Sequence, residues 1–155
     1  MKRWLWLGVG IVLVLALGAD SYAGRDVGKV SPAQAVRISR QDGAVRLETD
    51  LGFAGTGTDL AAALADMEAS SSSCVLLDTA EYLLLSPDCL DLLPDAMELL
   101  RPSCELCLAV GEGDLTRASE YLQIHPPGRT LGEYRAGVRE LEILQMGEGR
   151  MTFGG

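Results

Sequence analysis

Basic side chains and histidine are scarce in this sequence. Its 155 residues contain 13 Lys and Arg against 22 Asp and Glu, and the formal net charge is −9 at pH 7. The basic residues are scattered among carboxylates, whereas a protein that binds a polyanion needs them clustered. The sequence therefore predicts no nucleic-acid partner.

Residues that could carry catalysis or hold a cofactor are equally few. The only histidine, His125, stands beside two prolines. A general base would need a nucleophile and an orienting partner close by in space. The sequence has no oxygen-rich loop of the EF-hand kind that would bind calcium. We therefore expect a non-enzymatic protein with no catalytic residues, no cofactor and no metal site.

The longest apolar run lies at the N-terminus. Lys2 and Arg3 precede an uninterrupted apolar stretch over residues 4–19, a layout typical of an export signal. A helix of this length would span about 24 Å, which is short of the roughly 30 Å hydrocarbon core of a membrane. A cleaved signal is therefore favoured over a permanent anchor.

Small residues follow this run at the spacing of a cleavage site, so we expect cleavage between Ala23 and Gly24. An uncleaved segment would place the rest of the chain on the same side, because its basic end stays inside. Either outcome predicts an exported protein, secreted or held at the outer face of the cytoplasmic membrane.

The remaining chain is long enough for one domain, and its apolar fraction of 48% fits a globular core. We expect a signal peptide or N-terminal membrane anchor over residues 1–23 and a lead-in over 24–32. A single α/β domain should occupy residues 33–146, and a flexible C-terminal tail residues 147–155.

The predicted domain opens with a hairpin. Asp42-Gly43 separates two alternating apolar runs, which indicates antiparallel strands near 33–40 and 44–50. A glycine-rich segment, residues 52–57, should then break the sheet, and Thr58 is placed to cap a helix.

Strands and helices alternate after this helix. We expect strands at 75–77, 82–85 and 106–110, a helix from Ser86 that kinks or divides at Pro94, and helices over 116–122 and 133–144. This order predicts an α/β (α+β) fold, in which a mixed sheet is opened by an antiparallel hairpin and helices pack on it.

The four cysteines are the strongest candidates for chemistry, because an exported protein can form disulfides. Cys104 and Cys107 have the C-x-x-C spacing of thiol oxidoreductases, but they lie where a helix ends and a strand begins, without the helix N-terminus that activates such thiols. Two structural alternatives remain open: buried free thiols, or a disulfide that involves Cys74 or Cys89. A zinc site has less support, because only one pair has chelating spacing.

The glycine-rich segment 52–57 lies between a strand and a helix, where a phosphate-binding loop would be found. It lacks the Gly-Lys-Ser/Thr ending of such loops. A flexible turn that leads into a capped helix is therefore favoured over a nucleotide site.

The order of the elements is similar to that of a known family. A basic, apolar export signal precedes a two-stranded segment around an Asp-Gly turn (35–48) and a glycine-led helix (57–64). A Leu-rich helix (90–100), a strand that ends in small residues (106–114) and a segment ahead of a final helix (121–127) follow. Together they resemble the N-terminal domain of the Ger(x)C family, the membrane-attached C subunits of bacterial spore germinant receptors.

This resemblance implies a role in spore germination through protein–protein contacts at the membrane surface. The implied partners are membrane protein subunits of a germinant-receptor-like complex. Family members usually carry a lipid-accepting cysteine at the end of the export signal, whereas Asp20 stands there in this chain. Membrane proximity would therefore depend on the N-terminal segment itself.

Two alternative functions remain. The chain could be an exported thiol/disulfide protein that uses Cys104 and Cys107. It could also bind a small ligand through the glycine-rich segment 52–57.

Overall fold

The computed structural model describes residues 30–147 and 149–154. The expected signal segment 1–23 and its cleavage site at Ala23 and Gly24 lie outside these residues. Within the described ranges, no helix combines the length and the apolar character needed to span a membrane.

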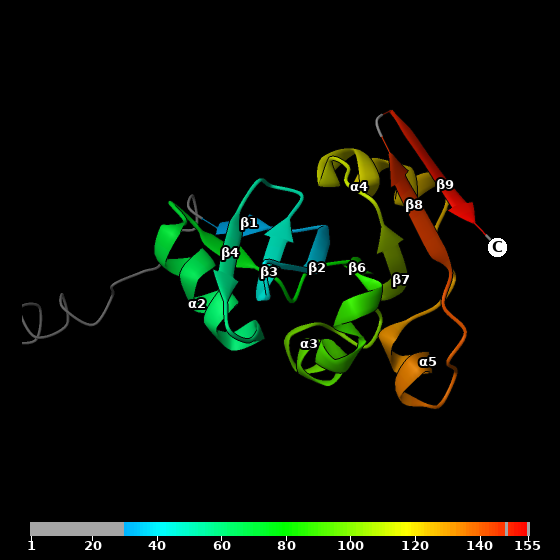
Figure 1. Cartoon of the computed structure of the whole chain (residues 1–155), viewed down its shortest axis with the longest axis horizontal. Helices are drawn as coiled ribbons and strands as arrows, with labels where there is room; N and C mark the ends of the chain where they lie inside the picture. The colour runs from blue at the N-terminus through cyan, green and yellow to red at the C-terminus, as the bar shows by residue number, and fades with distance from the viewer. Residues whose placement is uncertain (1–29, 148, 155) are drawn as a thin grey trace, which may run out of the picture.

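A seven-stranded mixed sheet forms the centre of the molecule, in the order β4-β3-β2-β6-β7-β8-β9 (Figure 1). The four middle strands β2, β6, β7 and β8 are parallel, and antiparallel strands flank them on both sides. The expected α+β fold, a mixed sheet covered by helices, is confirmed. The strand bounds are β2 Ala35–Gln41, β3 Ala44–Thr49, β4 Ala54–Gly57, β6 Tyr82–Leu85, β7 Glu105–Val110, β8 Ile143–Gly147 and β9 Arg150–Gly154.

The opening hairpin forms where its turn residues predict it. Gln41 pairs with Ala44, so that only Asp42 and Gly43 make the turn. Both have positive φ angles, 52° and 83°, as a turn that matches the right-handed twist of its strands requires.

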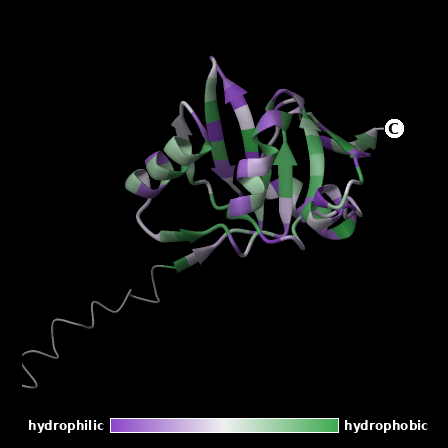
Figure 2. Ribbon diagram, turned by 90° about the horizontal axis from the view of Figure 1, so that it is seen from below, coloured by the Kyte–Doolittle hydropathy of each residue, from purple (hydrophilic) through white to green (hydrophobic). Residues whose placement is uncertain are grey.

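The helices cover the two faces of the sheet unequally. The larger hydrophobic cluster lies where α2 (Leu60–Ser70), α3 (Leu93–Leu99) and α5 (Leu131–Arg135) pack against one face. The smaller cluster lies on the other face, beneath α4 (Leu115–Ile124). Figure 2 shows the middle strands mainly in the hydrophobic colour, while the β2–β3 hairpin alternates with hydrophilic residues. β6 is therefore buried on both faces and β7 over most of its length, whereas β8 and the hairpin strand β3 bury mainly every second residue.

The glycine-rich segment is a strand and not a break in the sheet. Residues 54–57 form β4, which pairs with β3. The helix that follows begins one residue later than predicted, because Asp59 and not Thr58 is its cap. The Asp59 carboxylate accepts a hydrogen bond from the Ala62 N–H at 2.8 Å.

The predicted division of the next helix at Pro94 is confirmed. A 3-10 helix, η2 (Pro87–Leu92), precedes α3, and Pro94 lies in the first turn of α3. In the first turn a proline leaves no backbone hydrogen bond unmade, and this explains why the chain restarts there.

The C-terminal third differs most from the predictions. The helix expected over 133–144 is only the five-residue α5, because Gly137 has a φ of 112° and the chain then extends into β8. The expected flexible tail, 147–155, contains β9, which pairs with β8. The alternation of Leu144 and Met146, both buried under α4, explains why a strand forms in place of the helix.

The expected lead-in also contains a strand. Residues Val30–Pro32 form β1, which pairs in parallel with β5 (Cys74–Leu76) apart from the main sheet. The strand predicted at 75–77 therefore exists, but it does not join the central sheet.

Candidate functional site

The C-x-x-C cysteines lie in different hydrophobic clusters. Cys104 belongs to the larger cluster and Cys107 to the smaller one, on opposite faces of the sheet. The motif runs into β7, where side chains alternate between the faces, and residues three apart therefore point in opposite directions. All four cysteines are free thiols, and only Cys74 is exposed. The motif spacing does not bring two sulfur atoms to one site.

Burial also makes these thiols poor nucleophiles. It raises the pKa of Cys104 and of Cys107 to about 12, with smaller contributions from nearby carboxylates. Burial, with Asp88 next to it, raises the pKa of Cys89 to about 11. Because the thiolate is the reactive form, this arrangement favours the interpretation of these three cysteines as buried apolar side chains.

The glycines of segment 52–57 serve the packing of α2 on β4. A Cβ atom on Gly55 would lie 2.2 Å from the Ala63 carbonyl oxygen, and one on Gly57 would lie 2.4 Å from the Ala63 nitrogen. Only glycine permits so close an approach between strand and helix. The space that a phosphate would need at these two glycines is therefore filled by the backbone of α2.

His125 lies exposed at the end of α4. Its ring packs against Tyr121, with the ring centroids 4.7 Å apart, and its backbone N–H donates to the Tyr121 carbonyl oxygen at 2.9 Å. These contacts give His125 a role at the end of the helix.

A polar cluster occupies the part of the sheet that α4 leaves uncovered. Arg37 Nε donates to Glu48 Oε2 at 2.8 Å, and Arg46 Nη2 donates to Glu48 Oε1 at 2.9 Å. Burial alone would raise the pKa of Glu48, but the two arginines together hold it below its ordinary value of 4.5. Arg37 also donates to the Gly113 carbonyl oxygen at 3.2 Å and so ties β2 to the loop before α4.

A cleft of about 490 Å³ adjoins this cluster at the carboxyl ends of β2, β6 and β7. Ligands often bind at this position in α/β folds. Here the arginines already have carboxylate partners, since Glu48 binds two of them and Asp91 binds Arg40 at 2.7 Å. The cluster is therefore best explained as structural, because its arginines connect the β2–β3 hairpin to the loop before α4 and to η2.

A groove with an apolar floor runs between α2 and α3. It has a volume of about 440 Å³, and its floor contains leucine and alanine side chains such as Leu64, Ala65 and Leu99. Every ionisable side chain that lines it is acidic, namely Asp59, Glu68, Asp95 and Glu98. We call it the α2–α3 groove.

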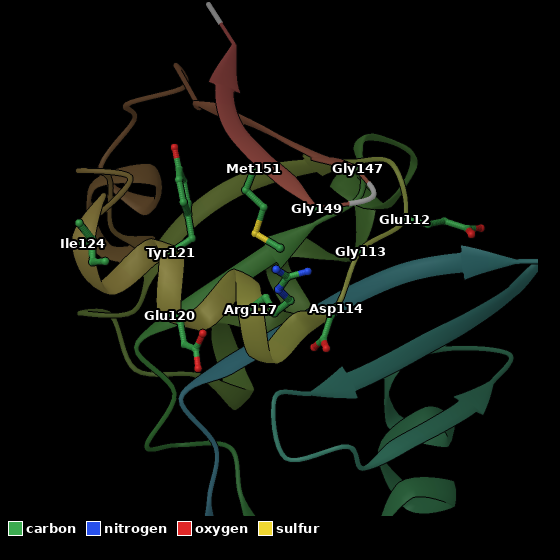
Figure 3. Close-up of a pocket in the computed structure, with 10 residues that line it drawn as sticks. All are labelled: Glu112, Gly113, Asp114, Arg117, Glu120, Tyr121, Ile124, Gly147, Gly149 and Met151. Atoms are coloured by element: carbon green, nitrogen blue, oxygen red, sulfur yellow. The ribbon is translucent and has the colours of Figure 1, made fainter.

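A second groove lies on the opposite face of the sheet, between α4 and the β8–β9 hairpin (Figure 3). It has a volume of about 450 Å³, with Arg117, Tyr121 and Ile124 on the side of α4 and Met151 on β9. In Figure 3 the guanidinium of Arg117 points toward Met151, whereas the side chain of Glu120 points away. We call it the α4–β9 groove.

In comparisons with known proteins, no family model matches the chain, and no curated protein or solved structure matches it either. The relationship to the Ger(x)C family stays a prediction.

Neither groove was predicted from the sequence, because each brings together segments that are far apart along the chain. The α2–α3 groove joins residues 59–68 to 95–99, and the α4–β9 groove joins 112–124 to 147–151. The sequence does hold one partial signal, because the carboxylates of residues 59–68 and 95–98 alternate with apolar side chains at helical spacing.

Proposed function

We propose that this chain is a non-enzymatic, exported domain that binds membrane protein subunits of a germinant-receptor-like complex. Its N-terminal segment would keep it near the membrane surface, and the α2–α3 groove would be the docking surface. The observation that carries this proposal is the combination of an apolar floor with charged side chains of a single sign.

The groove has the dimensions and chemistry to accept an amphipathic helix. The 11 residues of α2 make a wall about 16 Å long, which matches about three turns of a partner helix. An apolar stripe on that helix would cover Leu64 and Leu99, both only partly buried. Lys or Arg beside the stripe would meet the carboxylates of the rim, which favours basic partners and disfavours acidic ones.

The proposal is tested by photo-crosslinking in the native host. The full chain would carry a photoreactive phenylalanine in place of Ala65, which lines the groove, or in place of the exposed Asp78, which does not. After irradiation of sporulating cells, mass spectrometry identifies the adducts. We expect adducts with membrane receptor subunits from position 65 and not from position 78.

Charge reversal gives the matched control. The double variant Glu68→Lys, Glu98→Lys changes only exposed side chains, and we expect it to lower the crosslinking yield at position 65 about tenfold or more, which corresponds to about 1.4 kcal/mol. Adducts that contain no membrane receptor subunit would contradict the proposed function. Receptor adducts that survive the reversal would show that docking occurs without the acidic rim.

A further inference from the structure

The two edge strands of the sheet, β4 and β9, differ in how far other segments cover their outer backbone groups. At the β4 edge, α2 packs closely over the strand, and the Asp66 carboxylate accepts a hydrogen bond from the outward-facing Thr56 N–H at 2.9 Å. β9 forms backbone hydrogen bonds with its neighbour β8. No other residue in the described part of the chain forms a hydrogen bond to the backbone of β9 like the one between Asp66 and Thr56 at the β4 edge. In an antiparallel pair every second residue points its N–H and C=O away from the partner. Within residues 30–147 and 149–154, the β9 edge therefore presents backbone donors and acceptors that have no partner strand.

The sequence of β9 gives this edge little protection. Natural sheets shield exposed edges with charged side chains, lysine above all, and with proline, bulges or a covering helix. β9 reads Arg-Met-Thr-Phe-Gly, in which only the first residue, Arg150, is charged, and it pairs with β8 residue for residue, without a bulge. An added strand could continue the sheet here in regular register.

The α4–β9 groove is lined by Met151 of this edge strand and would receive side chains of an added strand. Tyr121 of α4, which lines the groove, packs against Phe153 of β9, with the ring centroids 6.0 Å apart. Ile124, one helical turn further along α4, is 75% exposed, the most exposed of the large apolar side chains within the described residues. A helix that faces an edge strand across an apolar groove is an arrangement suited to strand addition.

Charge indicates what such a strand would carry. Arg117 points into the groove, and no carboxylate in the described part of the chain lies within ion-pair distance of it. The acidic residues that line the groove, Glu112, Asp114 and Glu120, point away from it in Figure 3. The charge directed at an occupant is therefore positive, which is complementary to a carboxylate.

We propose that the α4–β9 groove binds an extended peptide segment that adds to β9 as an eighth strand. An apolar side chain of the peptide packs against Tyr121 and Ile124, and a carboxylate of the peptide pairs with Arg117. The site lies on the opposite face of the sheet from the α2–α3 groove and does not depend on the function proposed for that groove. The chain would then dock an extended acidic segment on one face and a basic helix on the other.

The probe for this site comes from a displayed library of random eight-residue peptides, selected against the purified protein. We expect the enriched sequences to alternate β-branched or aromatic residues with polar ones and to carry Asp, Glu or a free C-terminal carboxylate. A fluorescent peptide of the consensus sequence is then titrated with the protein, and binding is measured by anisotropy.

Three changes identify the contacts. We expect Arg117→Glu to weaken binding of this peptide at least tenfold, and Ile124→Ser to weaken it about threefold to tenfold. Both side chains are exposed, so the variants should keep the unfolding midpoint of the parent protein. N-methylation of alternate peptide amides should abolish binding in one register and spare it in the other, a result that only backbone pairing explains.

The α2–α3 variant Glu68→Lys, Glu98→Lys serves as the control and should bind the peptide unchanged. The proposal is overturned if the library yields no enrichment or if Arg117→Glu binds the consensus peptide as tightly as the parent. It is also overturned if the protein forms dimers that Ile124→Ser abolishes, because a second copy would then be the occupant of the edge.

Discussion

The two faces of the sheet differ in what covers them and in what they leave open. Among the residues that the structure describes, twenty buried ones form the cluster beneath α2, α3 and α5, whereas ten form the cluster beneath α4. The larger cluster extends across β2, β3, β6 and β7. On the other face α4 does not cover the β2–β3 hairpin, where Arg37, Arg46 and Glu48 form ion pairs. Most of the stability should therefore come from the first face. The second face is closed by polar contacts and keeps a groove at its outer edge.

The largest expected effect separates the two clusters on a single strand. Leu83 and Leu84 are adjacent in β6 and fully buried, but the first belongs to the larger cluster and the second to the smaller. We expect Leu83→Ala to lower the free energy of unfolding by about 4–5 kcal/mol and Leu84→Ala by about 2–3 kcal/mol, because the thinner face can relax around the cavity. Urea unfolding measures both. Equal losses would mean that the two faces contribute alike.

The second prediction tests the close packing of α2 on the larger face. Gly55→Ala would force a methyl group against the α2 backbone, and we expect it to cost about 2–4 kcal/mol in unfolding free energy. Gly43→Ala is the control, because its Cβ meets nothing within 4 Å and only its positive φ opposes the change, at about 1 kcal/mol. The interpretation fails if Gly43→Ala is the more damaging variant in thermal unfolding.

The third prediction concerns the ion pairs of Glu48 with Arg37 and Arg46, on the face of the smaller cluster. We expect Glu48→Gln to cost about 1–2 kcal/mol, because it leaves two arginines without their shared carboxylate. The pKa of Glu48 is lowered on folding, so its contribution is present above its ordinary value of 4.5 and is lost as the pH falls through the folded value. As the pH falls below 4.5, the melting temperature of the parent protein should therefore decrease more steeply than that of the variant. Parallel pH profiles would contradict this assignment.

The last prediction concerns the rates at which the thiols react. It involves the smallest change in stability, but the difference in rate between the thiols should be large. With a disulfide reagent at pH 8, Cys74 should react within the mixing time of a manual assay, while Cys104 and Cys107 should react only as the protein unfolds. A Cys104→Ser variant should leave the labelling rate of the native protein unchanged. Rapid oxidation of Cys104 and Cys107 to a shared disulfide would reverse the assignment of the two residues to separate faces.

Local signals in the sequence were sufficient where neighbouring residues decide the structure. Asp42-Gly43 encodes its own turn, and Pro94 interrupts its own helix, so both features were predicted from the residues alone. The middle strand β7 was also predicted, because a short apolar run bounded by turn residues suits a buried strand.

The sequence was insufficient where distant segments decide the structure. From the sequence, Gly55 and Gly57 are typical of a flexible loop, but in the fold they form a strand against which α2 packs closely. The run from Glu133 has a helical pattern, but its second half forms β8, which pairs with β7. The C-x-x-C spacing suggests a pair of thiols, but the alternation of β7 separates them. Both grooves lie between elements that meet only in the folded chain, so local motifs could not reveal either groove. The helical spacing of carboxylates and apolar residues indicated only the separate walls of the α2–α3 groove.

The connection from β7 to β8 passes from one face of the sheet to the other. After α4 the chain crosses at residues 125–130, where the Leu106 N–H donates to the Arg129 carbonyl oxygen at 2.7 Å, and then enters α5 on the opposite side. This crossing segment, residues 125–130, connects the helix layers on the two faces of the sheet, α4 and α5, and binds both to the first residues of β7. We call it the strap. Amide hydrogen exchange in the two layers should consequently report a single cooperative opening, because neither layer can detach without releasing the strap that holds the other.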